Sequence, residues 1–300
     1  MLSSNAQHVN TITGASPDQE THYRFPTARL RTTLQDSTRE PLVLVACGSF
    51  SPITHLHLRM FELAADYARH STNFELMGGY FSPVSDAYKK EGLAPAKHRL
   101  NMVKLACEET SDRWDVDPWE ATKAAYTPTA LVLDHFDYEI NTRMGGVEVR
   151  QGERDPETGM PVKRRVKIML LAGSDLLKTM SDEGVWDAND LNHILGNYGA
   201  FIVERMGADI KKATSALSAW SNNIHQVEQT VLNDVSSTKV RLLLRKEYSV
   251  RYLLPESVVD YIEENGLYSR PFHRQGSTSV ATGEEHAKPN WEKLLTQISK

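Results

Sequence analysis

The chain has 300 residues, of which 40% are hydrophobic, and its formal net charge at pH 7 is −5. A mildly acidic total does not favour a general nucleic-acid binder, although a local basic pocket for phosphates is compatible with it. Because no apolar run approaches about 18 residues, we expect no membrane-spanning helix. Cys47 and Cys107 fall inside apolar patterns, which indicates buried thiols in a reduced compartment rather than a disulfide or metal pair.

The first forty residues are polar, with scattered Thr, Ser, Gln and Arg. This composition predicts a flexible N-terminal extension over residues 1–40. Residues 1–20 lack an apolar core segment, so we expect no secretory signal, and Asp18 and Glu20 argue against a mitochondrial presequence.

A change of pattern between residues 42 and 59 indicates the centre of the fold. Leu42 to Cys47 is an apolar run typical of a strand buried on both faces. Gly48 to Thr54 carries Gly, Ser and Pro and predicts a loop, and from Leu56 the apolar spacing becomes helical. A strand, a tight loop and a helix form the first unit of a nucleotide-binding α/β sheet, whose loop and helix N-terminus can bind phosphate.

The residues of this loop narrow the class of protein. They match neither G-x-G-x-x-G nor G-x-x-x-x-G-K-[ST], so neither a dehydrogenase-type site nor a P-loop is expected. Gly48, Phe50, Pro52, Thr54 and His57 instead match the G-x-F-x-P-x-[HT]-x-x-H motif of the nucleotidyltransferase superfamily. The full stretch, GSFSPIT-x-x-HLR, most resembles the eukaryotic nicotinamide-mononucleotide adenylyltransferases.

Strand and helix patterns alternate along the rest of the chain. Apolar runs and spacing predict further elements in this order: a strand over 74–81, a helix over 96–109, a short strand running into a loop over 115–120, a helix over 128–143, a strand and helix start over 167–177, a strand over 197–205, an outer helix over 209–220, a short strand over 224–227, a helix after 237 and a helix over 255–265. We expect Arg99 on the outer face of its helix. The alternation predicts a Rossmann-like, doubly wound, mostly parallel α/β sheet in one catalytic domain over residues 41–270.

Two other segments lack a regular pattern. Residues 145–162 are rich in Gly and charge, which predicts a disordered insertion, and residues 271–300 are expected to be a loose tail with a short helix considered over 291–298. The basic run from Val162 to Lys167 is typical of a solvated strand edge or of a nuclear import signal. The expected compartment is therefore nuclear, cytoplasmic or both.

A second diagnostic stretch runs from Val235 to Arg241. Ser236 and Ser237 are helix-cap residues followed by helical apolar spacing, so the residues alone predict a capped helix. The stretch also resembles the family motif I-S-S-T-x-x-R, with Val235 in place of Ile. The resemblance implies catalytic roles for His57 and Arg241, and it implies an ATP site formed by Gly48, Ser49, Phe50, His57, Gly173, Asp175, Ser236, Ser237, Thr238 and Arg241.

The resemblance also implies a mononucleotide site formed by Lys90, Trp119, Trp186 and Arg205. Taken alone, these residues are compatible with a solvated loop, core or lid aromatics and a surface charge. In the family the lysine and arginine approach phosphate, while the two tryptophans frame a pyridine ring. Stacking suits such a ring because it buries both faces without specific hydrogen bonds.

The implied reaction is transfer of AMP from ATP to nicotinamide mononucleotide, and also to nicotinic acid mononucleotide. The products are NAD, or its deamido form, and pyrophosphate. The attacking 5′-phosphate is already ionised at neutral pH, so catalysis needs alignment and charge stabilisation rather than a general base. No His, Cys, Asp or Glu cluster has metal-cage spacing, so Mg²⁺ is expected mainly on the ATP phosphates. The resemblance further implies a homo-oligomer, and we expect no nucleic-acid or membrane partner.

Three alternatives stay open at this stage. A sister nucleotidyltransferase could act on phosphopantetheine or choline phosphate, although Trp119 and Trp186 disfavour acceptors without an aromatic ring. A class I tRNA-synthetase-like protein is disfavoured by the absence of K-M-S-K-S, of an anticodon-binding domain and of strong basic charge. A non-catalytic, chaperone-like role on the same scaffold is disfavoured by the intact His57 and Arg241.

Overall fold

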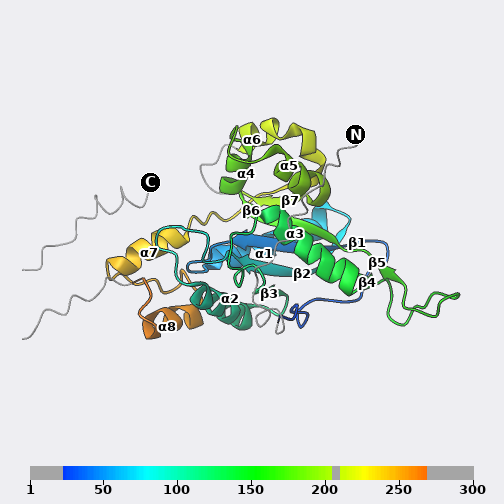
Figure 1. Cartoon of the computed structure of the whole chain (residues 1–300), viewed down its shortest axis with the longest axis horizontal. Helices are drawn as coiled ribbons and strands as arrows, with labels where there is room; N and C mark the ends of the chain where they lie inside the picture. Colours follow the sequence, from blue (N-terminus) through cyan, green and yellow to red (C-terminus); the bar gives the residue numbers. More distant parts are fainter. Residues whose placement is uncertain (1–22, 205–209, 269–300) are drawn as a thin grey trace, which may run out of the picture.

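The computed structural model describes residues 23–204 and 210–268, which form an α/β fold around one large sheet (Figure 1). The strand order is β3-β2-β1-β6-β7-β8, and every pairing in this sheet is parallel. The strands are β1 Glu40–Gly48, β2 Phe74–Pro83, β3 Trp114–Val116, β6 Lys167–Gly173, β7 Ala200–Val203 and β8 Ile224–Val227. The order reverses between β1 and β6, and ligands of such sheets bind beyond the carboxyl ends of the strands at this point. The predicted Rossmann-like, doubly wound α/β fold is confirmed.

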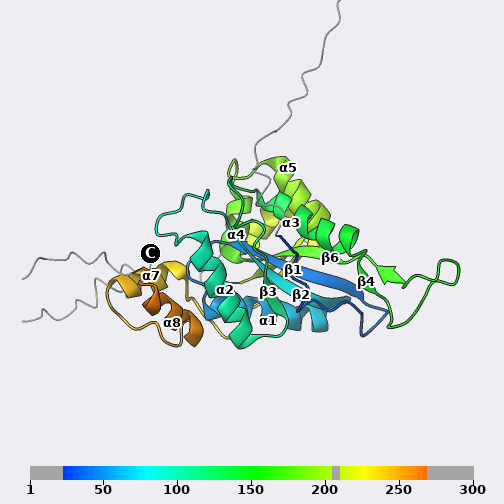
Figure 2. The same cartoon turned by 60° about the horizontal axis from the view of Figure 1, so that its bottom comes forward.

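Helices cover both faces of the sheet, as Figure 2 shows with α1 and α2 on one side and α3, α4 and α5 on the other. Alternate residues of β1 enter two separate cores, because neighbouring side chains of a strand point to opposite faces. Leu42 and Leu44 pack in the core of α1, while Val43 and Val45 pack in the core of α3. The helical segments are α1 His55–Ser71, α2 Ala96–Thr110, α3 Thr129–Asp137, η2 Tyr138–Arg143, α4 Ser174–Ser181, α5 Ala188–Leu191, η3 Asn192–Tyr198, α6 Ile210–Ala216, η4 Ser218–Asn223, α7 Ser237–Arg245 and α8 Glu256–Glu264.

The segment before β1 differs from the predicted flexible extension. Phe25, Leu30 and Leu34 are buried in the core on the α3 side of the sheet, and the hydroxyl of Tyr80 donates to the carbonyl of Pro26 at 2.8 Å. The prediction rested on the mean polarity of residues 1–40, which hides a few apolar side chains large enough to hold a segment in place. It is wrong for residues 23–40, whereas residues 1–22 and the predicted tail over 271–300 lie outside the described residues.

The insertion also has a definite structure. β4 Val147–Glu148 pairs antiparallel with β5 Lys163–Arg164, and the chain between them extends away from the sheet (Figure 1). The carboxylate of Asp155 accepts hydrogen bonds from the backbone N–H groups of Glu157 and Thr158 at 3.0 and 2.8 Å. The predicted disorder is therefore wrong here, because a short hairpin and an Asp-capped turn satisfy the backbone without any hydrophobic periodicity.

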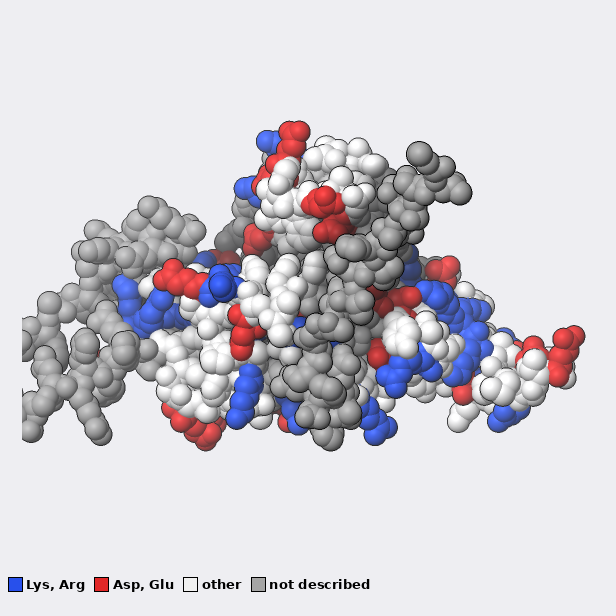
Figure 3. All heavy atoms as spheres, in the orientation of Figure 1, with Lys and Arg blue, Asp and Glu red and all other residues white. Residues whose placement is uncertain are grey.

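Basic side chains gather around this hairpin, at the right of the face in Figure 3. Lys163 donates to the carbonyl of Met144 at 2.6 Å, Arg164 to that of Arg39 at 2.7 Å, and the guanidinium of Arg165 contacts the carboxylate of Asp137. These contacts are typical of a strand edge, the first of the two interpretations of the basic run.

Within the described residues, no helix combines the length and the apolar character needed to cross a membrane.

Candidate active site

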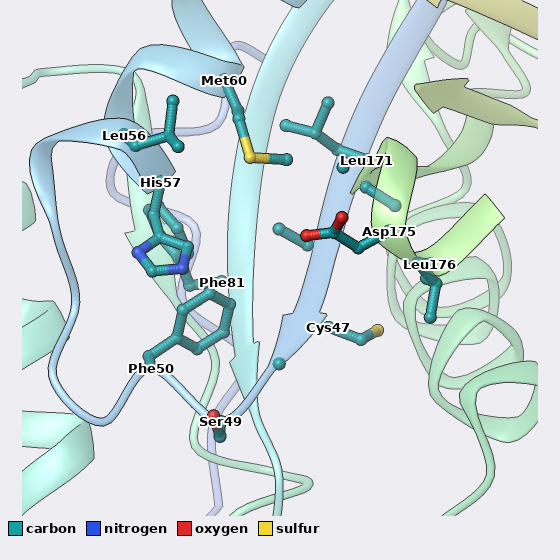
Figure 4. Close-up of a pocket in the computed structure, with 14 residues that line it drawn as sticks. Cys47, Ser49, Phe50, Leu56, His57, Met60, Phe81, Leu171, Asp175 and Leu176 are labelled. Carbon is teal, nitrogen blue, oxygen red and sulfur yellow. The ribbon is translucent and has the colours of Figure 1, made fainter. Parts of the chain in front are cut away.

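A cavity of about 200 Å³ opens where the strand order reverses, between the carboxyl ends of β1 and β6 (Figure 4). The first turns of α1 and α4 complete its wall. Six of the predicted ATP-site residues line it, namely Gly48, Ser49, Phe50, His57, Gly173 and Asp175. Its other lining residues were not predicted as site residues: Ala46, Cys47, Leu56, Met60, Phe81, Leu171, Ala172 and Leu176. Most of these are apolar core residues of neighbouring elements, so their patterns indicated burial but not a cavity.

His57 is held in one orientation at the start of α1. Its Nδ1 accepts a hydrogen bond of 3.0 Å from the backbone N–H of Thr54 and lies 2.9 Å from the Thr54 hydroxyl oxygen. Because an N–H group donates to Nδ1, that nitrogen carries no proton, and the hydrogen-bond network assigns the ring proton to Nε2. Figure 4 shows the imidazole facing the cavity. His57 is therefore arranged as an Nε2–H donor toward a ligand in the cavity.

Phe50 shapes the loop between β1 and α1. Its φ is 44°, in the left-handed region that few residues other than glycine adopt. The buried ring meets His57 edge-on at 5.3 Å and Phe81 at 5.1 Å, and this packing offsets the backbone strain. A Cβ at Gly48 would lie 3.1 Å from the same ring, so the glycine lets the phenylalanine close over the end of β1.

The two diagnostic motifs meet in the structure. The hydroxyl of Ser237 donates to the carbonyl of Pro52 at 2.8 Å, and the guanidinium of Arg241 donates to the carbonyl of Ser51 at 2.7 Å. Ser236 is the N-cap of α7, and its hydroxyl oxygen accepts from the backbone N–H of Lys239 at 3.2 Å. The predicted capped helix is confirmed, and its N-terminus lies against the loop that follows Gly48.

Arg241 is buried at this junction. Burial lowers the pKa of its guanidinium below the ordinary value, but a guanidinium stays charged at neutral pH. The second terminal nitrogen of the guanidinium donates to the hydroxyl of Thr238 at 3.4 Å, and Thr238 is exposed. A fixed positive charge thus lies one turn inside a helix N-terminus, a combination that favours an anion.

A second arginine connects the junction to the loop after β2. Arg99 is fully buried, contrary to the prediction that it lies on the outer face of α2. It donates to the carbonyl of Ala94 at 2.7 Å, to that of Ser49 at 3.2 Å, and to the carboxylate of Asp86 at 3.1 Å. Helical spacing cannot indicate this burial, because an arginine can enter a core only where several acceptors from distant segments meet it. Lys90, in the loop that Arg99 holds, is exposed.

Trp119 lies on a buried polar cluster beside the sheet. Its indole stacks on the imidazole of His135 with ring centroids 4.0 Å apart and an interplanar angle of 4°. The buried carboxylate of Asp117 accepts from His135 and from the hydroxyl of Tyr23, each at 2.9 Å. Burial is the larger cause that raises the pKa of Tyr23, and the negative charge of Asp117 raises it further. The phenol is therefore a hydrogen-bond donor. The cluster fixes the plane of the Trp119 ring.

The apolar spacing of residues 128–143 predicted that His135 lies on a helix face rather than in a site. The structure buries it to 8% exposure and gives it a role under Trp119. Its partner Tyr23 lies 112 residues earlier in the chain. No local pattern could have indicated that contact.

Trp186 lies between α4 and α5, on the same side of the sheet as Trp119. Both indoles pack against the core that α3 and α4 contribute, and the Trp186 N–H donates to the hydroxyl of Thr179 at 3.2 Å. The structure thus brings both tryptophans to one side of the sheet. Arg205 lies outside the described residues.

Glu120, next to Trp119, is a buried carboxyl at the edge of this region. The hydroxyl of Ser82 donates to it at 2.5 Å, and burial raises its pKa to about 7. A carboxyl of this kind changes charge near neutral pH, whereas an ordinary glutamate is ionised there.

Comparisons with known proteins show which proteins this chain is similar to. The model of the cytidylyltransferase-like family matches residues 45–243. The chain is 54% identical to a fission yeast (Schizosaccharomyces pombe) nicotinamide/nicotinic acid mononucleotide adenylyltransferase over 83% of this chain and 66% of that protein. It is 36% identical to the bovine (Bos taurus) nicotinamide/nicotinic acid mononucleotide adenylyltransferase 1 over 79% of this chain and 92% of that protein. It therefore spans slightly less than two thirds of the fission yeast relative and most of the bovine one.

A solved structure supports the fold. The Plasmodium falciparum nicotinic acid mononucleotide adenylyltransferase complexed with NaAD superposes with a TM-score of 0.54 at 20% identity, over 77% of this chain and 98% of that one. At 20% identity, this similarity shows only that the two proteins share the arrangement of their strands and helices.

Proposed function

This chain belongs to the nicotinamide/nicotinic acid mononucleotide adenylyltransferase family, among the cytidylyltransferase-like proteins, and we propose that it transfers AMP from ATP to a pyridine mononucleotide. The acceptors are nicotinamide mononucleotide and nicotinic acid mononucleotide, and the products are NAD or its deamido form and pyrophosphate. The observation that carries the proposal is the contact of the α7 N-terminus with the loop after β1, beside the cavity that His57 lines.

The cavity between β1 and β6 suits the adenosine end of ATP. Its wall is mostly apolar, and Gly173 lacks a side chain where a nucleoside would approach the end of β6. Asp175, in the first turn of α4, supplies a polar group on the same wall. In this arrangement Gly48, Ser49 and Phe50 present loop backbone to the phosphates that follow the nucleoside.

The phosphate chain would extend from His57 toward α7. The Nε2–H of His57 donates toward the α-phosphate, where negative charge builds as the bond to pyrophosphate breaks. The hydroxyl groups of Ser236 and Ser237 are engaged in the cap and in the contact with Pro52. The donors to the β- and γ-phosphates are therefore the backbone N–H groups of the first turn together with Arg241 and Thr238.

The acceptor phosphate attacks the α-phosphorus in line with the departing pyrophosphate. It is ionised at neutral pH and needs no side chain to remove a proton. The protein contributes position and fixed charge, since protein contacts hold the histidine, the arginine and the helix N-terminus in place.

The mononucleotide would lie on the α3 and α4 side of the same edge. Trp119 and Trp186 are proposed to frame the pyridine ring, and Lys90 and Arg205 to bind its phosphate. The support is that Trp119 is held flat by His135 and that both indoles face one core. Stacking on a preset aromatic surface costs little ordering on binding.

Magnesium fits this site as an ion carried by the phosphates. Asp175 is the acidic residue among those lining the cavity, and the described ranges contain no group of three His, Cys, Asp or Glu side chains that would hold a metal. Mg²⁺ on nucleotides needs only one or two protein carboxylates and keeps several waters. When bound, it would neutralise part of the phosphate charge next to Arg241.

We also propose that the chain forms a homo-oligomer and acts in the nucleus, the cytoplasm or both. Light scattering of the purified chain and microscopy of a tagged chain test these two points separately.

The reaction is tested by pyrophosphate release from ATP and Mg²⁺ with four acceptors offered separately: the two pyridine mononucleotides, phosphopantetheine and choline phosphate. Release with the pyridine nucleotides alone is the expected result. Release with phosphopantetheine or choline phosphate instead would assign a sister activity and contradict the role of the tryptophans. No pyrophosphate release with any of the four acceptors would contradict the proposal and favour the non-catalytic role.

A further inference from the structure

Both faces of the Trp119 indole are occupied in this structure. The imidazole of His135 lies parallel to one face, with centroids 4.0 Å apart. The ammonium of Lys123 lies over the ring at 4.5 Å from its centroid. The imidazole fills its own side, so the ammonium covers the opposite face, which is the face that a stacking ligand would have to use.

Lys123 reaches this position because it follows Trp119 by one turn of chain. The backbone N–H of Thr122 donates to the carbonyl of Pro118, and that of Lys123 to the carbonyl of Glu120, each at 3.1 Å. Within residues 23–204 and 210–268, no carboxylate lies within ion-pair distance of the Lys123 ammonium. Among the described residues, the contact that holds the ammonium is thus the ring face, through a weak cation–π interaction that a better partner can replace.

A pyridine ring that stacks on Trp119 must displace this ammonium sideways. The pyridinium ring of either mononucleotide is positive and repels a lysine beside it. Nicotinic acid mononucleotide carries a ring carboxylate that can pair with the displaced ammonium, whereas the amide of nicotinamide mononucleotide has no negative charge to offer. The flexible four-carbon stem lets Lys123 follow the edge of the ring while its backbone stays in the turn.

We propose that Lys123 determines substrate specificity, pairing with the ring carboxylate and favouring nicotinic acid mononucleotide over the amide. This inference rests on the proposed function and concerns the same site. The nearest acidic neighbour in sequence, Glu120, does not compete for the ammonium, because its carboxyl is buried and hydrogen-bonded by Ser82.

The test compares kcat/KM for the two mononucleotides in the wild-type chain and in Lys123→Met, Lys123→Gln and Lys123→Arg. Removing the charge should lower the ratio of acid to amide by about fivefold, the upper range for a partly exposed ion pair. Lys123→Arg should keep most of the preference because it keeps the charge. Lys104→Met, which removes an exposed lysine of α2, is the matched control and should leave the ratio unchanged.

Three results would contradict the inference. An unchanged ratio in Lys123→Met and Lys123→Gln, with turnover of both substrates intact, would overturn it and leave the proposed function standing. An equal fall in kcat/KM for both mononucleotides would show that Lys123 contributes to packing in general and does not select between the substrates. If the wild-type chain turned over neither mononucleotide, the proposed function itself would fail and this inference with it.

Discussion

The hydroxyl of Ser237, the first residue of α7, donates a 2.8 Å hydrogen bond to the carbonyl of Pro52, which lies 185 residues earlier in the loop after β1. Arg241 repeats the connection one turn later through the carbonyl of Ser51 at 2.7 Å. The two contacts fix the N-terminus of α7 against the loop after β1. The proposed triphosphate site is therefore assembled by contacts within the fold itself.

His57 should contribute far more to turnover than to folding, in which it supplies one cap hydrogen bond. His57→Ala removes the Nε2–H donor to the α-phosphate, and we expect kcat to fall by about 10²- to 10³-fold, the usual loss for one charge-stabilising donor. Steady-state kinetics with ATP and a pyridine mononucleotide measure the loss, and circular dichroism checks the fold. His55→Ala is the control, since His55 lies outside the cavity of Figure 4. A His57→Ala enzyme within about threefold of wild type would contradict the assigned role.

The contact of Ser237 with Pro52 should matter less to turnover than the charge of Arg241. Ser237→Ala keeps the backbone N–H and loses one hydrogen bond, so the free energy of unfolding should fall by about 1 kcal/mol with a small change in kcat. Arg241→Met removes a buried charge beside the helix N-terminus and should lower kcat/KM for ATP far more. Denaturant unfolding and initial rates separate the two effects. Similar kinetic losses in both variants would argue against the arginine as the main phosphate ligand.

Trp186 should contribute to binding of the mononucleotide and not to binding of ATP. Trp186→Ala removes a proposed stacking surface for the pyridine ring, so the Kd of the mononucleotide should rise by about tenfold while that of ATP stays close to wild type. Isothermal titration with each substrate alone measures both constants. Equal loss of the two affinities would refute the stacking role and indicate a general disturbance around α4 and α5.

Glu120 should make stability depend on pH below neutrality. Its folded pKa is about 7 against an ordinary value of 4.5, so between these values the unfolded chain loses a proton that the folded chain keeps. The contribution to stability is complete below pH 4.5 and is lost as pH rises to 7, by roughly 3 kcal/mol in total. Urea unfolding of wild type and Glu120→Gln at pH 5 and pH 8 measures it. The Gln variant should show a smaller fall, and identical pH profiles would contradict the burial of an ionisable group here.

Phe25 tests the structure of the segment before β1. Its ring is buried and lies 5.1 Å from Tyr80 and 5.8 Å from Phe136, so Phe25→Ala should lower the free energy of unfolding by about 3 kcal/mol. Thr27→Ala, an exposed site two residues later, serves as the control. Equal stability of the two variants would mean that the segment contributes nothing to the core.

Local patterns predicted most of the fold and the part of the site that lies in the two motifs. The strand before Gly48, the helix after it and the cap at Ser236 follow from apolar spacing and cap chemistry, and all three are present. The contact between the motifs did not follow from either one. It depends on the parallel sheet, which brings the carboxyl ends of distant strands to one edge.

The other side of the site depended on contacts that no local pattern contains. Tyr23, Asp117 and His135 come from three segments and meet only under Trp119. Arg99 lies in an amphipathic helix whose pattern placed it outside. The carbonyls of Ser49 and Ala94 and the carboxylate of Asp86 together make its burial acceptable. Composition likewise hid the buried Phe25, since one aromatic ring changes the average polarity of forty residues very little.

The most direct measurement follows the phosphorus atoms of ATP. The chain is incubated with nicotinic acid mononucleotide and ATP labelled with ³²P at the α- or the γ-phosphate, and the products are separated. Transfer of AMP places the α-label in the dinucleotide and the γ-label in pyrophosphate. An α-label that remains in ATP or appears only as AMP, with no labelled dinucleotide, would contradict the assignment of this chain as an adenylyltransferase.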